Sequence, residues 1–402
     1  MGLFSAARAS TSADTLEEMI RSVYGGGVSS SGSAVNASNA LQVGAVYTCN
    51  LVLSQSVGQT PLHLFQKNKD GTTEKVQDHP LKELVCDAPN QWMTDYDFKA
   101  LVMTHLCMRG NSVWLPTRVG GSIRELIPIH PDLIVGAEQD EKYRIFVKVQ
   151  RPGTGTVDTI PYSKLLHFKS LSTNGFWGVD PITAAREMIG LSVSAEKYGA
   201  KFFASGAKMG GILMHPGKLS ETASSNLIES FNDRVGDIEN SHKTMLLEEG
   251  SKWIQTTMTS DNAQFLETRK YQRSEIAGFY RIPAHFINDL ENATFSNVEH
   301  LDLSFVKHTL SPYYVSIEKT LRRALMTPDE KKRFFFKFNA DGLVRGDIQS
   351  RYDAYYKAVG GPWLTADEVR KLDDLGTIEG GDELLKPMNM GAGNEPTQPT
   401  ED

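Results

Sequence analysis

Residues 281–325 read RIPAHFINDLENATFSNVEHLDLSFVKHTLSPYYVSIEKTLRRAL, and this stretch decides the fold. A helix ends near its start, and a polar loop, Glu291–Asn297, follows and carries one aromatic residue, Phe295. A long amphipathic helix then begins. It contains Pro312, which has no N–H group to donate to the helix, so we expect a kink there. The stretch shows no catalytic triad and no spacing of metal ligands.

The composition is typical of a globular protein that is not built to hold nucleic acid tightly. Of the 402 residues, 40% are apolar and 23% are charged, and the formal net charge is −7. A protein that grips DNA phosphates should carry a surplus of basic residues. Three cysteines without metal-ligand spacing favour a reducing compartment. No apolar run reaches the roughly 20 residues that a membrane span needs.

The first 180 residues indicate an α+β unit after a low-complexity start. Residues 1–39 are rich in Ser, Gly and Ala, and we expect disorder there, apart from Leu16–Val23. A helix from Ala40 leads into an extended segment at 61–65, and Thr94 is placed to cap a helix that ends at Arg109. A further helix is expected at 79–87, and strands of a mostly antiparallel sheet are expected at 112–118, 125–129, 133–137, 144–150 and 165–169.

A small α/β module lies between two long helices. Asp180-Pro181 opens the first, because an N-cap followed by proline is a strong helix start, and the pattern runs to about Ser205. Its many small residues suit close packing in a ring, and equally an ordinary core helix. The second long helix covers about 261–281. The module between them is expected to have strands at 211–214, 244–247 and 253–258 and a helix at 219–235.

The end of the chain returns to a strand and two short helices. Arg333–Phe338 is typical of a strand, and Asp347–Val359 has helical spacing. Thr365 begins a capping box with Glu368. Residues 387–402 are expected to be a disordered acidic tail.

The sequence lacks recognisable catalytic and cofactor-binding motifs. Gly217-Lys218 lacks the upstream glycine and the following Ser or Thr of a phosphate-binding loop. His300 and His308 fall on one side of a helix without a third ligand, so surface histidines explain them better than a metal site. We therefore expect no enzyme and no cofactor. A metal-dependent nuclease or hydrolase stays open as a less favoured alternative, on the acids Asp341, Asp347, Glu248 and Glu249.

The order of several short motifs resembles the portal proteins of tailed bacteriophages, of the long-tailed type with lambda-like heads. Arg281–His285 and Ala293–Glu299 have the order and spacing of that family's tunnel segment. The two long helices around a small module match its stem, clip and stem. The resemblance spans about 40–385, and its other motifs are His79-Pro-Leu81, Asn90, Arg109-Gly-Asn111, Pro128-Ile-His-Pro131 and Phe338–Leu343.

The resemblance implies a portal-type α+β fold. Such a fold has an α+β wing, two long stem helices flanking a small α/β clip, a kinked tunnel helix and a short helical crown. The corresponding ranges are 40–179 and 327–344 for the wing, 180–208 and 259–282 for the stem, 209–258 for the clip, 283–326 for the tunnel loop and helix, and 345–386 for the crown.

The resemblance also implies a function and partners. Portal proteins form rings, usually dodecamers, at one capsid vertex of the virion, after assembly in the host cytoplasm. Double-stranded DNA passes through the ring during packaging and ejection. The terminase large subunit docks on the clip, a head–tail adaptor later replaces it, and major capsid and scaffold proteins are further partners. Another phage structural protein or adaptor is the main alternative, although adaptors are usually much shorter.

Three groups of residues would carry this function. Pro312 would kink the tunnel helix. Phe295 would touch DNA, wedge between neighbouring subunits or pack in the core, and we favour the wedge. The tunnel loop would line the channel with Glu291, Asn292, Ala293, Thr294, Phe295, Ser296 and Asn297, none of them basic. The clip would present acids to the motor or adaptor, namely Glu221, Glu229, Asp233, Asp237, Glu239, Glu248 and Glu249.

Overall fold

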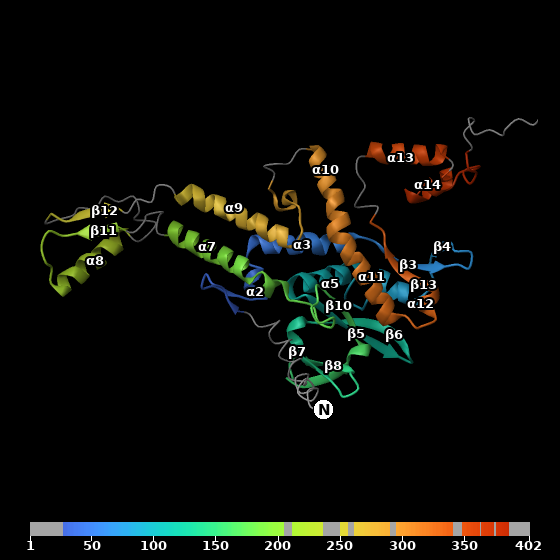
Figure 1. Ribbon diagram of the computed structural model, residues 1–402, viewed down its shortest axis with the longest axis horizontal. Helices are drawn as coiled ribbons and strands as arrows, with labels where there is room; N and C mark the ends of the chain where they lie inside the picture. The colour runs from blue at the N-terminus through green and yellow to red at the C-terminus, as the bar shows by residue number, and fades with distance from the viewer. Residues whose placement is uncertain are drawn as a thin grey trace, which may run out of the picture. The chain divides into compact units, whose positions relative to one another are not determined.

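The structure is a computed structural model, shown in Figure 1. It forms two compact units, Met1–Asn339 and Ala340–Asp402. Helices and antiparallel sheets are both present, so the α+β prediction is confirmed. The structure describes residues 27–204, 211–235, 250–255, 261–289, 295–340, 348–361, 363–373 and 375–385.

Helices α3 (Gly44–Gln59) and α5 (Asp95–Arg109) pack against each other in the core of the first unit. Their contact buries Leu53 of α3 and Val102 of α5 completely. The hydroxyl of Thr94 accepts a hydrogen bond from the N–H of Asp97, and Gly110 ends α5 with a φ of +68°. Both ends of α5 therefore lie where the sequence predicted them, because the capping chemistry is local.

The strands of the first unit include three antiparallel three-stranded sheets rather than the single sheet that the sequence suggested. The five strands predicted between residues 112 and 169 are all present, whereas β4 (Thr73–Lys75) and β9 (Val157–Pro161) were not predicted. Strand β13 (Phe334–Phe338) pairs with β3 (Leu62–Lys67), and the rings of Phe335 and Phe65 stack with centroids 5.6 Å apart. The sheets are β10-β5-β6 (Leu166–Lys169, Asn111–Val119, Ser122–Ile129), β13-β3-β4 (Phe334–Phe338, Leu62–Lys67, Thr73–Lys75) and β7-β8-β9 (Ile134–Gln139, Ile145–Gln150, Val157–Pro161).

Two buried histidines lie in this core and are held neutral. Nδ1 of His105 is 3.3 Å from the hydroxyl of Ser112. His167 lies between the hydroxyl of Tyr162 (3.1 Å) and Oδ1 of Asn111 (3.0 Å). Since Oδ1 of Asn111 only accepts hydrogen bonds, His167 donates from Nε2 and accepts at Nδ1. Burial lowers the pKa of His105 to about 4 and the pKa of His167 to about 3.

Acid is therefore expected to destabilise the first unit. The two folded pKa values lie below the unfolded value of about 6.5, so the unfolded chain binds more protons as the pH falls below 6.5. Each histidine then costs on the order of 2 kcal/mol of stability at pH 5, and nothing above pH 7. Urea unfolding between pH 8 and pH 5 measures this loss. The variant His167→Gln should show a flatter pH profile; a profile parallel to that of the parent protein would refute the assignment.

Residues 27–40 correct the expectation of disorder. They form a hairpin of β1 (Gly27–Val28) and β2 (Ala34–Val35), followed by the short helix α2 (Ala37–Ala40). The hairpin packs on helix α7 (Arg186–Ala204), where the hydroxyls of Ser33 and Ser194 are 2.9 Å apart. A Cβ on Gly190 would lie 2.4 Å from the Cβ of Ser29, so this part of the small-residue stripe of α7 receives the hairpin of the same chain.

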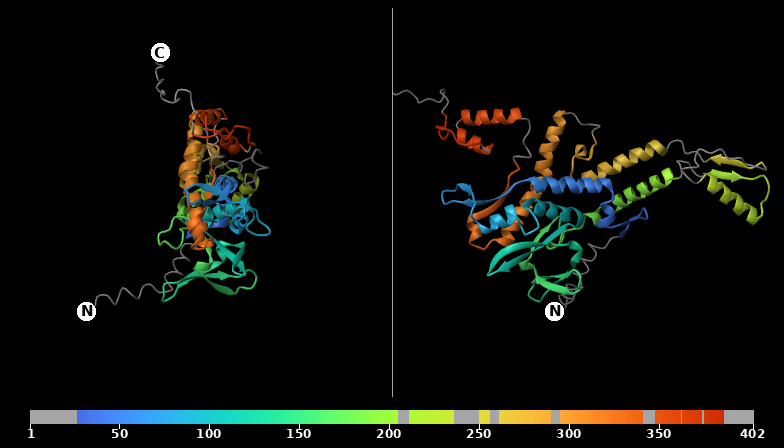
Figure 2. Two further views of the ribbon diagram at one scale, coloured as in Figure 1. Left: turned by 90° about the vertical axis from the view of Figure 1, so that its right-hand side faces the viewer. Right: turned by 180° about the vertical axis from the view of Figure 1, so that it is seen from behind.

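The helix that starts at Asp180-Pro181 is broken, which corrects the prediction of one continuous helix. It consists of α6 (Pro181–Ala184) and α7 (Arg186–Ala204), because Ala185 leaves the helical conformation with a ψ of 11°. Helix α9 (Asp261–Phe279) contacts α7, and Nη2 of Arg269 lies 3.5 Å from Oε1 of Glu196. The two helices run side by side in Figure 1 and in the right-hand view of Figure 2.

A small module follows α7 and precedes α9 in the chain. Its described elements are β11 (Gly211–Met214), α8 (Glu221–Val235) and β12 (Lys252–Gln255), and the two strands pair antiparallel. The strand predicted at 244–247 lies outside the described residues.

Short elements complete the first unit, and two helices form most of the described second unit. In the second unit, the N–H of Ile378 donates to Asp367, and the predicted capping box of Thr365 and Glu368 is present. The remaining bounds are Pro80–Lys82 (α4), Glu83–Asp87 (η1), Pro131–Leu133 (η2), Tyr162–Lys164 (η3), Glu330–Arg333 (α12), Ile348–Gly360 (α13) and Ala366–Leu372 (α14).

Candidate functional site

The predicted tunnel helix is a single helical path with a widened turn inside it. Helix α10 (Phe295–Ser304) passes into the π-helical segment η6 (Phe305–Leu310) and then into α11 (Ser311–Leu325). The N–H of Ser311 donates to the carbonyl of Val306, five residues back. This wide turn directly precedes Pro312, and the helix axis changes direction there in Figure 1. The interruption that the sequence placed at the proline is thus a π-helical turn that ends two residues before it.

Side chains of α11 fix the helix to the sheets beneath it. The hydroxyl of Thr60 donates to the carbonyl of Ser56, so it accepts the hydrogen bond from the Tyr314 hydroxyl, 2.8 Å away. The ring of Tyr314 also stacks on Phe338, with centroids 4.5 Å apart. Glu318 accepts from the N–H of Phe338 at 2.9 Å. These contacts join α11 to the end of α3 and to β13.

Substitutions at Tyr314 should separate the hydrogen bond from the packing. Tyr314→Phe removes only the bond to Thr60 and is expected to cost about 1 kcal/mol. Tyr314→Ala also removes the buried ring and is expected to cost about 4 kcal/mol. Thermal or urea unfolding of both variants measures the difference. Similar losses for the two variants would contradict the view that the ring, rather than the hydroxyl, fixes α11.

The segment that enters the predicted tunnel loop is tied to helices on both sides. Helix α9 ends at Phe279 and is followed by the left-handed residue Arg281 (φ +56°); the short helix η5 (Ala284–Ile287) is followed by a second left-handed residue, Asn288 (φ +61°). The hydroxyl of Ser274 on α9 donates to Asp289 at 3.0 Å. Nε2 of His285 lies 2.8 Å from Oδ1 of Asp302 on α10. Both flanks of residues 290–294 are therefore anchored to the first unit.

The loop residues divide into two groups. Glu291, Asn292, Ala293 and Thr294 lie outside the described residues. Phe295, Ser296 and Asn297 form the first turn of α10, so the prediction that they belong to the loop is wrong. The apolar spacing of Val298, Leu301 and Phe305 continues back to Phe295, and it favours a helix from that residue. The direction of the Phe295 side chain stays a prediction.

The structure brings together few of the acids assigned to the clip. Glu221 and Glu229 are exposed on α8, and Asp233 lies on the same helix. Glu221 lies in the first turn of α8, where a carboxylate stabilises the helix through the positive end of its dipole. This interaction explains the residue without a binding partner. Four further clip acids lie outside the described residues: Asp237, Glu239, Glu248 and Glu249. The same holds for Asp341 and Asp347, which the alternative of a metal-dependent nuclease or hydrolase would use. Within the described part of the chain, no three His, Cys, Asp or Glu residues are grouped to hold a metal ion.

The motif Arg109-Gly-Asn111 forms the junction between α5 and the long helix α7. Asn111 accepts from the N–H of Gly178 at 2.7 Å and donates to its carbonyl at 2.8 Å. A Cβ on Gly110 would lie 2.0 Å from the carbonyl oxygen of Val179. The next residue, Asp180, caps α6 through the N–H of Ile182 at 2.8 Å. This motif thus sets where the helix α6–α7 leaves the core.

Three other short motifs of the resemblance, at His79, Asn90 and His130, also have structural roles. Nδ1 of His79 accepts from the N–H of Leu81 and caps α4, and His130 caps η2 in the same way. Nδ2 of Asn90 donates to the carbonyl of Leu126 at 2.9 Å. None of these side chains needs a ligand to explain it. The motifs at His79, Asn90, Arg109–Asn111 and Pro128–Pro131 therefore have structural roles in the fold.

The family profile described as phage portal protein matches residues 44–374. The chain belongs to the phage portal protein family. The match covers every described element from α3 through α14, including the predicted tunnel helix.

Individual portal proteins resemble the chain over most of its length. The probable portal protein of Streptomyces phage phiC31 is 30% identical over 396 residues, which cover 94% of this chain and 85% of that protein. The portal protein of Enterobacteria phage HK97 is 30% identical over 379 residues, covering 90% and 87%. A chain from the neck of an empty gene transfer agent particle, computed with C6 symmetry, shares the fold with a TM-score of 0.59, 17% identity and coverage of 91% and 100%.

The residues that support the predicted tunnel helix were not predicted from the sequence. Tyr314, Glu318 and the pair of His285 and Asp302 make contacts between segments that are distant in the chain. Arg323 lies over the ring of Tyr162, 5.5 Å from its centroid. The helical spacing of Tyr314, Ile317 and Leu321 indicates which face of the helix is buried. It does not indicate which residues contact that face.

Proposed function

We propose that copies of this chain close into a ring, expected to be a dodecamer, at one capsid vertex. Double-stranded DNA passes through the ring during packaging and ejection. Membership of the portal protein family carries this proposal. The symmetric neck in which the fold recurs supports a ring of identical subunits.

The charge of the tunnel segment supports passage of DNA without retention. From 282 to 306 the sequence contains four acids and no Lys or Arg. Each cation that pairs with a phosphate adds salt-dependent affinity, and a moving duplex would have to break every such pair. A segment without cations leaves brief polar contacts only, which the Thr294, Ser296 and Asn297 side chains would supply.

The portal regions follow from this proposal. We assign the wing to 40–179 with 327–344, since β13 pairs with β3. The stem helices are α7 and α9, and the module of β11, α8 and β12 is the clip, whose acids would face the terminase large subunit and later the head–tail adaptor. Helices α13 and α14 form the crown. Major capsid and scaffold proteins are the remaining expected partners.

Catalysis has no part in the proposal. The family is structural, and the ATP-driven step would belong to the terminase. In the described part of the chain, no helix has the length and apolar character that a membrane span requires. The proposed place of the protein is the portal vertex of the virion, after assembly in the host cytoplasm.

Light scattering of the purified full-length chain tests the assembly. The proposal expects a single species whose mass is a large multiple of 44.5 kDa. Incubation with DNA and Mg²⁺ should leave the DNA intact. A chain that stays monomeric at every concentration and cuts DNA would instead favour the nuclease alternative.

A further inference from the structure

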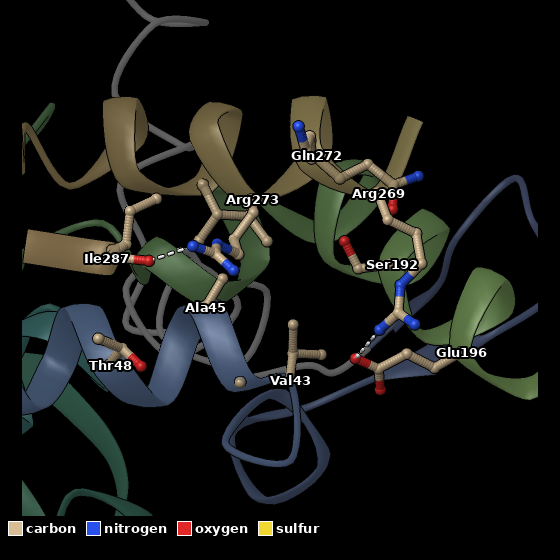
Figure 3. Close-up of a pocket in the computed structure, with 12 residues that line it drawn as sticks. Val43, Ala45, Thr48, Ser192, Glu196, Arg269, Gln272, Arg273 and Ile287 are labelled. Atoms are coloured by element: carbon tan, nitrogen blue, oxygen red, sulfur yellow. Dashed lines mark hydrogen bonds and ion pairs between the residues drawn. The ribbon is translucent and has the colours of Figure 1, made fainter. Parts of the chain in front are cut away.

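The first unit covers its apolar side chains with its own chain. Even around a cavity of about 560 Å³ between α3, α7 and α9, the lining residues Val43 and Ile276 are buried. Arg269 at the same cavity pairs with Glu196, as a dashed line in Figure 3 shows. The side chains of this unit thus satisfy one another, even at a place where their packing is incomplete.

The second unit lacks an apolar core in its described part. Of residues 352–361, 363–373 and 375–385, only Asp367 and Gly381 are buried. The carboxylate of Asp367 accepts from the N–H of Ile378 at 2.9 Å, and the N–H of Asp367 donates to the carbonyl of Gly381 at 2.8 Å. A polar junction therefore holds the segment that follows α14 to the first turn of that helix.

A unit of this kind needs apolar burial from outside itself. Helices α13 and α14 have 13 and 7 residues. Helices of this length are marginal in water without tertiary packing. Small folded units usually rely on disulfides, metals or association when their own core is too small, and residues 340–402 contain no cysteine. We therefore expect a surface outside the second unit to cover its apolar residues.

Large aromatic side chains are exposed along α13 and at its end. Tyr352 and Tyr356 are four residues apart, which places them on one face of the helix, and 53% and 83% of their surface is exposed. Trp363 is 83% exposed, and its N–H donates to the carbonyl of Ala358 at 3.0 Å, near the C-terminal end of α13. Tyrosine and tryptophan are the residues that most often anchor protein interfaces. We call Tyr352, Tyr356, Trp363 and the exposed Lys357 the aromatic patch.

The segment after α14 has a complementary chemistry, and we call residues 375–385 the acidic segment. Residues 373–385 carry five acids and no base, whereas residues 348–372 carry four bases against three acids. Two parts of the same unit are thus of opposite net charge. The exposed apolar residues of the acidic segment are Leu375, Ile378, Leu384 and Leu385, and its exposed acids are Glu379, Asp382 and Glu383.

The aromatic patch and the acidic segment do not cover each other within one copy. The acidic segment is fixed at Asp367, and both surfaces stay exposed. Two different surfaces that complement each other produce a head-to-tail contact between copies, and such a contact repeats until a ring closes. Opposite charge favours this pairing over contact between two like surfaces.

We propose that the aromatic patch of one copy binds the acidic segment of the neighbouring copy. The apolar side chains of the acidic segment would pack on the rings of Tyr356 and Trp363, and its acids would face Lys357. Each second unit would then receive from its neighbours the apolar burial that it lacks. This proposal rests on the proposed ring, and it adds a contact that fixes the order of the second units around that ring.

Disulfide linking in the full-length chain tests the contact. Asp353→Cys is exposed on α13 one turn before Tyr356 and Lys357, and Thr377→Cys is exposed in the acidic segment. A variant with both cysteines should form a ladder of linked chains beyond the dimer after mild oxidation, because each copy is joined to two neighbours. Each single variant is the matched control and cannot extend a ladder past the dimer. The native cysteines are buried or half-buried.

The outcomes separate this contact from the ring itself, since light scattering measures assembly before oxidation. Intact rings without links between chains would overturn the contact. A link within one chain, identified by mass spectrometry of the joined peptides, would mean that the acidic segment folds back on its own copy, and it would also overturn the proposal. Absence of rings would refute the proposed function, and this contact with it.

Hydrogen exchange of the assembled protein gives an independent check. Tyr356→Ala should speed the exchange of the backbone amides of α13 about tenfold, because an anchor of the contact is lost. Tyr143→Ala is the control, since Tyr143 is also 83% exposed but lies in the first unit, and it should leave the exchange of α13 unchanged. Equal exchange in the two variants would contradict the role of the aromatic patch.

Discussion

Replacing Gly110 with alanine is expected to lower the free energy of unfolding by about 4 kcal/mol. Alanine loses about 1 kcal/mol at a φ of +68°, where only glycine is unstrained. Its Cβ would also lie 2.0 Å from the carbonyl oxygen of Val179, a backbone atom held by the hydrogen bonds of Gly178 to Asn111. Relieving that overlap requires a backbone shift of the kind that costs about 1–3 kcal/mol or more.

Two other glycines separate these contributions. Gly121 has a φ of +89° with no atom near its virtual Cβ, so Gly121→Ala should cost about 1 kcal/mol. Gly44, in the first turn of α3, has ordinary angles and open space, so Gly44→Ala should be neutral or slightly stabilising. Urea unfolding of the three variants measures the series. If Gly110→Ala costs no more than Gly121→Ala, the close approach at the α5–α6 junction is not real.

Replacing Glu291–Thr294 with four glycines is expected to block DNA packaging while leaving the ring intact. The flanks of this loop are fixed by Ser274 to Asp289 and by His285 to Asp302, so the fold of the first unit should not depend on the loop side chains. The loop itself is proposed to contact the moving duplex. Counting DNA-filled heads and imaging rings of the variant measure the two effects separately.

A glycine replacement elsewhere serves as the control for this loop. The turn Asn68–Thr72 joins β3 to β4 on the surface, far in sequence from the tunnel segment. Glycines there should leave packaging unchanged. Normal packaging by the tunnel-loop variant would refute the role of Glu291–Thr294, whereas loss of rings would show that the loop is needed for assembly.

The sequence correctly predicted helix ends that depend on capping residues close by in the chain. Thr94, Asp180 and Thr365 cap helices as the sequence indicated, and Gly110 ends α5. In contrast, β9 ends in proline and lacks alternation, so only its pairing with β8 makes it a strand. The hairpin at Gly27–Val35 has a low-complexity sequence, and its order comes from packing on α7.

The candidate site was less predictable than the fold. The sequence located the predicted tunnel segment, but the π-helical turn before Pro312 buries Phe305 and Thr309, and Thr309 donates to the distant carbonyl of Arg281, which no local pattern indicates. In the proposed ring, the environment of the loop and of the clip acids would depend further on neighbouring subunits and on DNA. A pattern within one chain carries no information on those contacts.

Electron cryo-microscopy of the purified full-length protein tests the central claim most directly. We predict a closed ring of identical subunits, with the N-terminal end of α10 towards an axial hole that is wide enough for a double helix. Single molecules under all conditions, or a ring whose hole is too narrow for duplex DNA, would contradict the account.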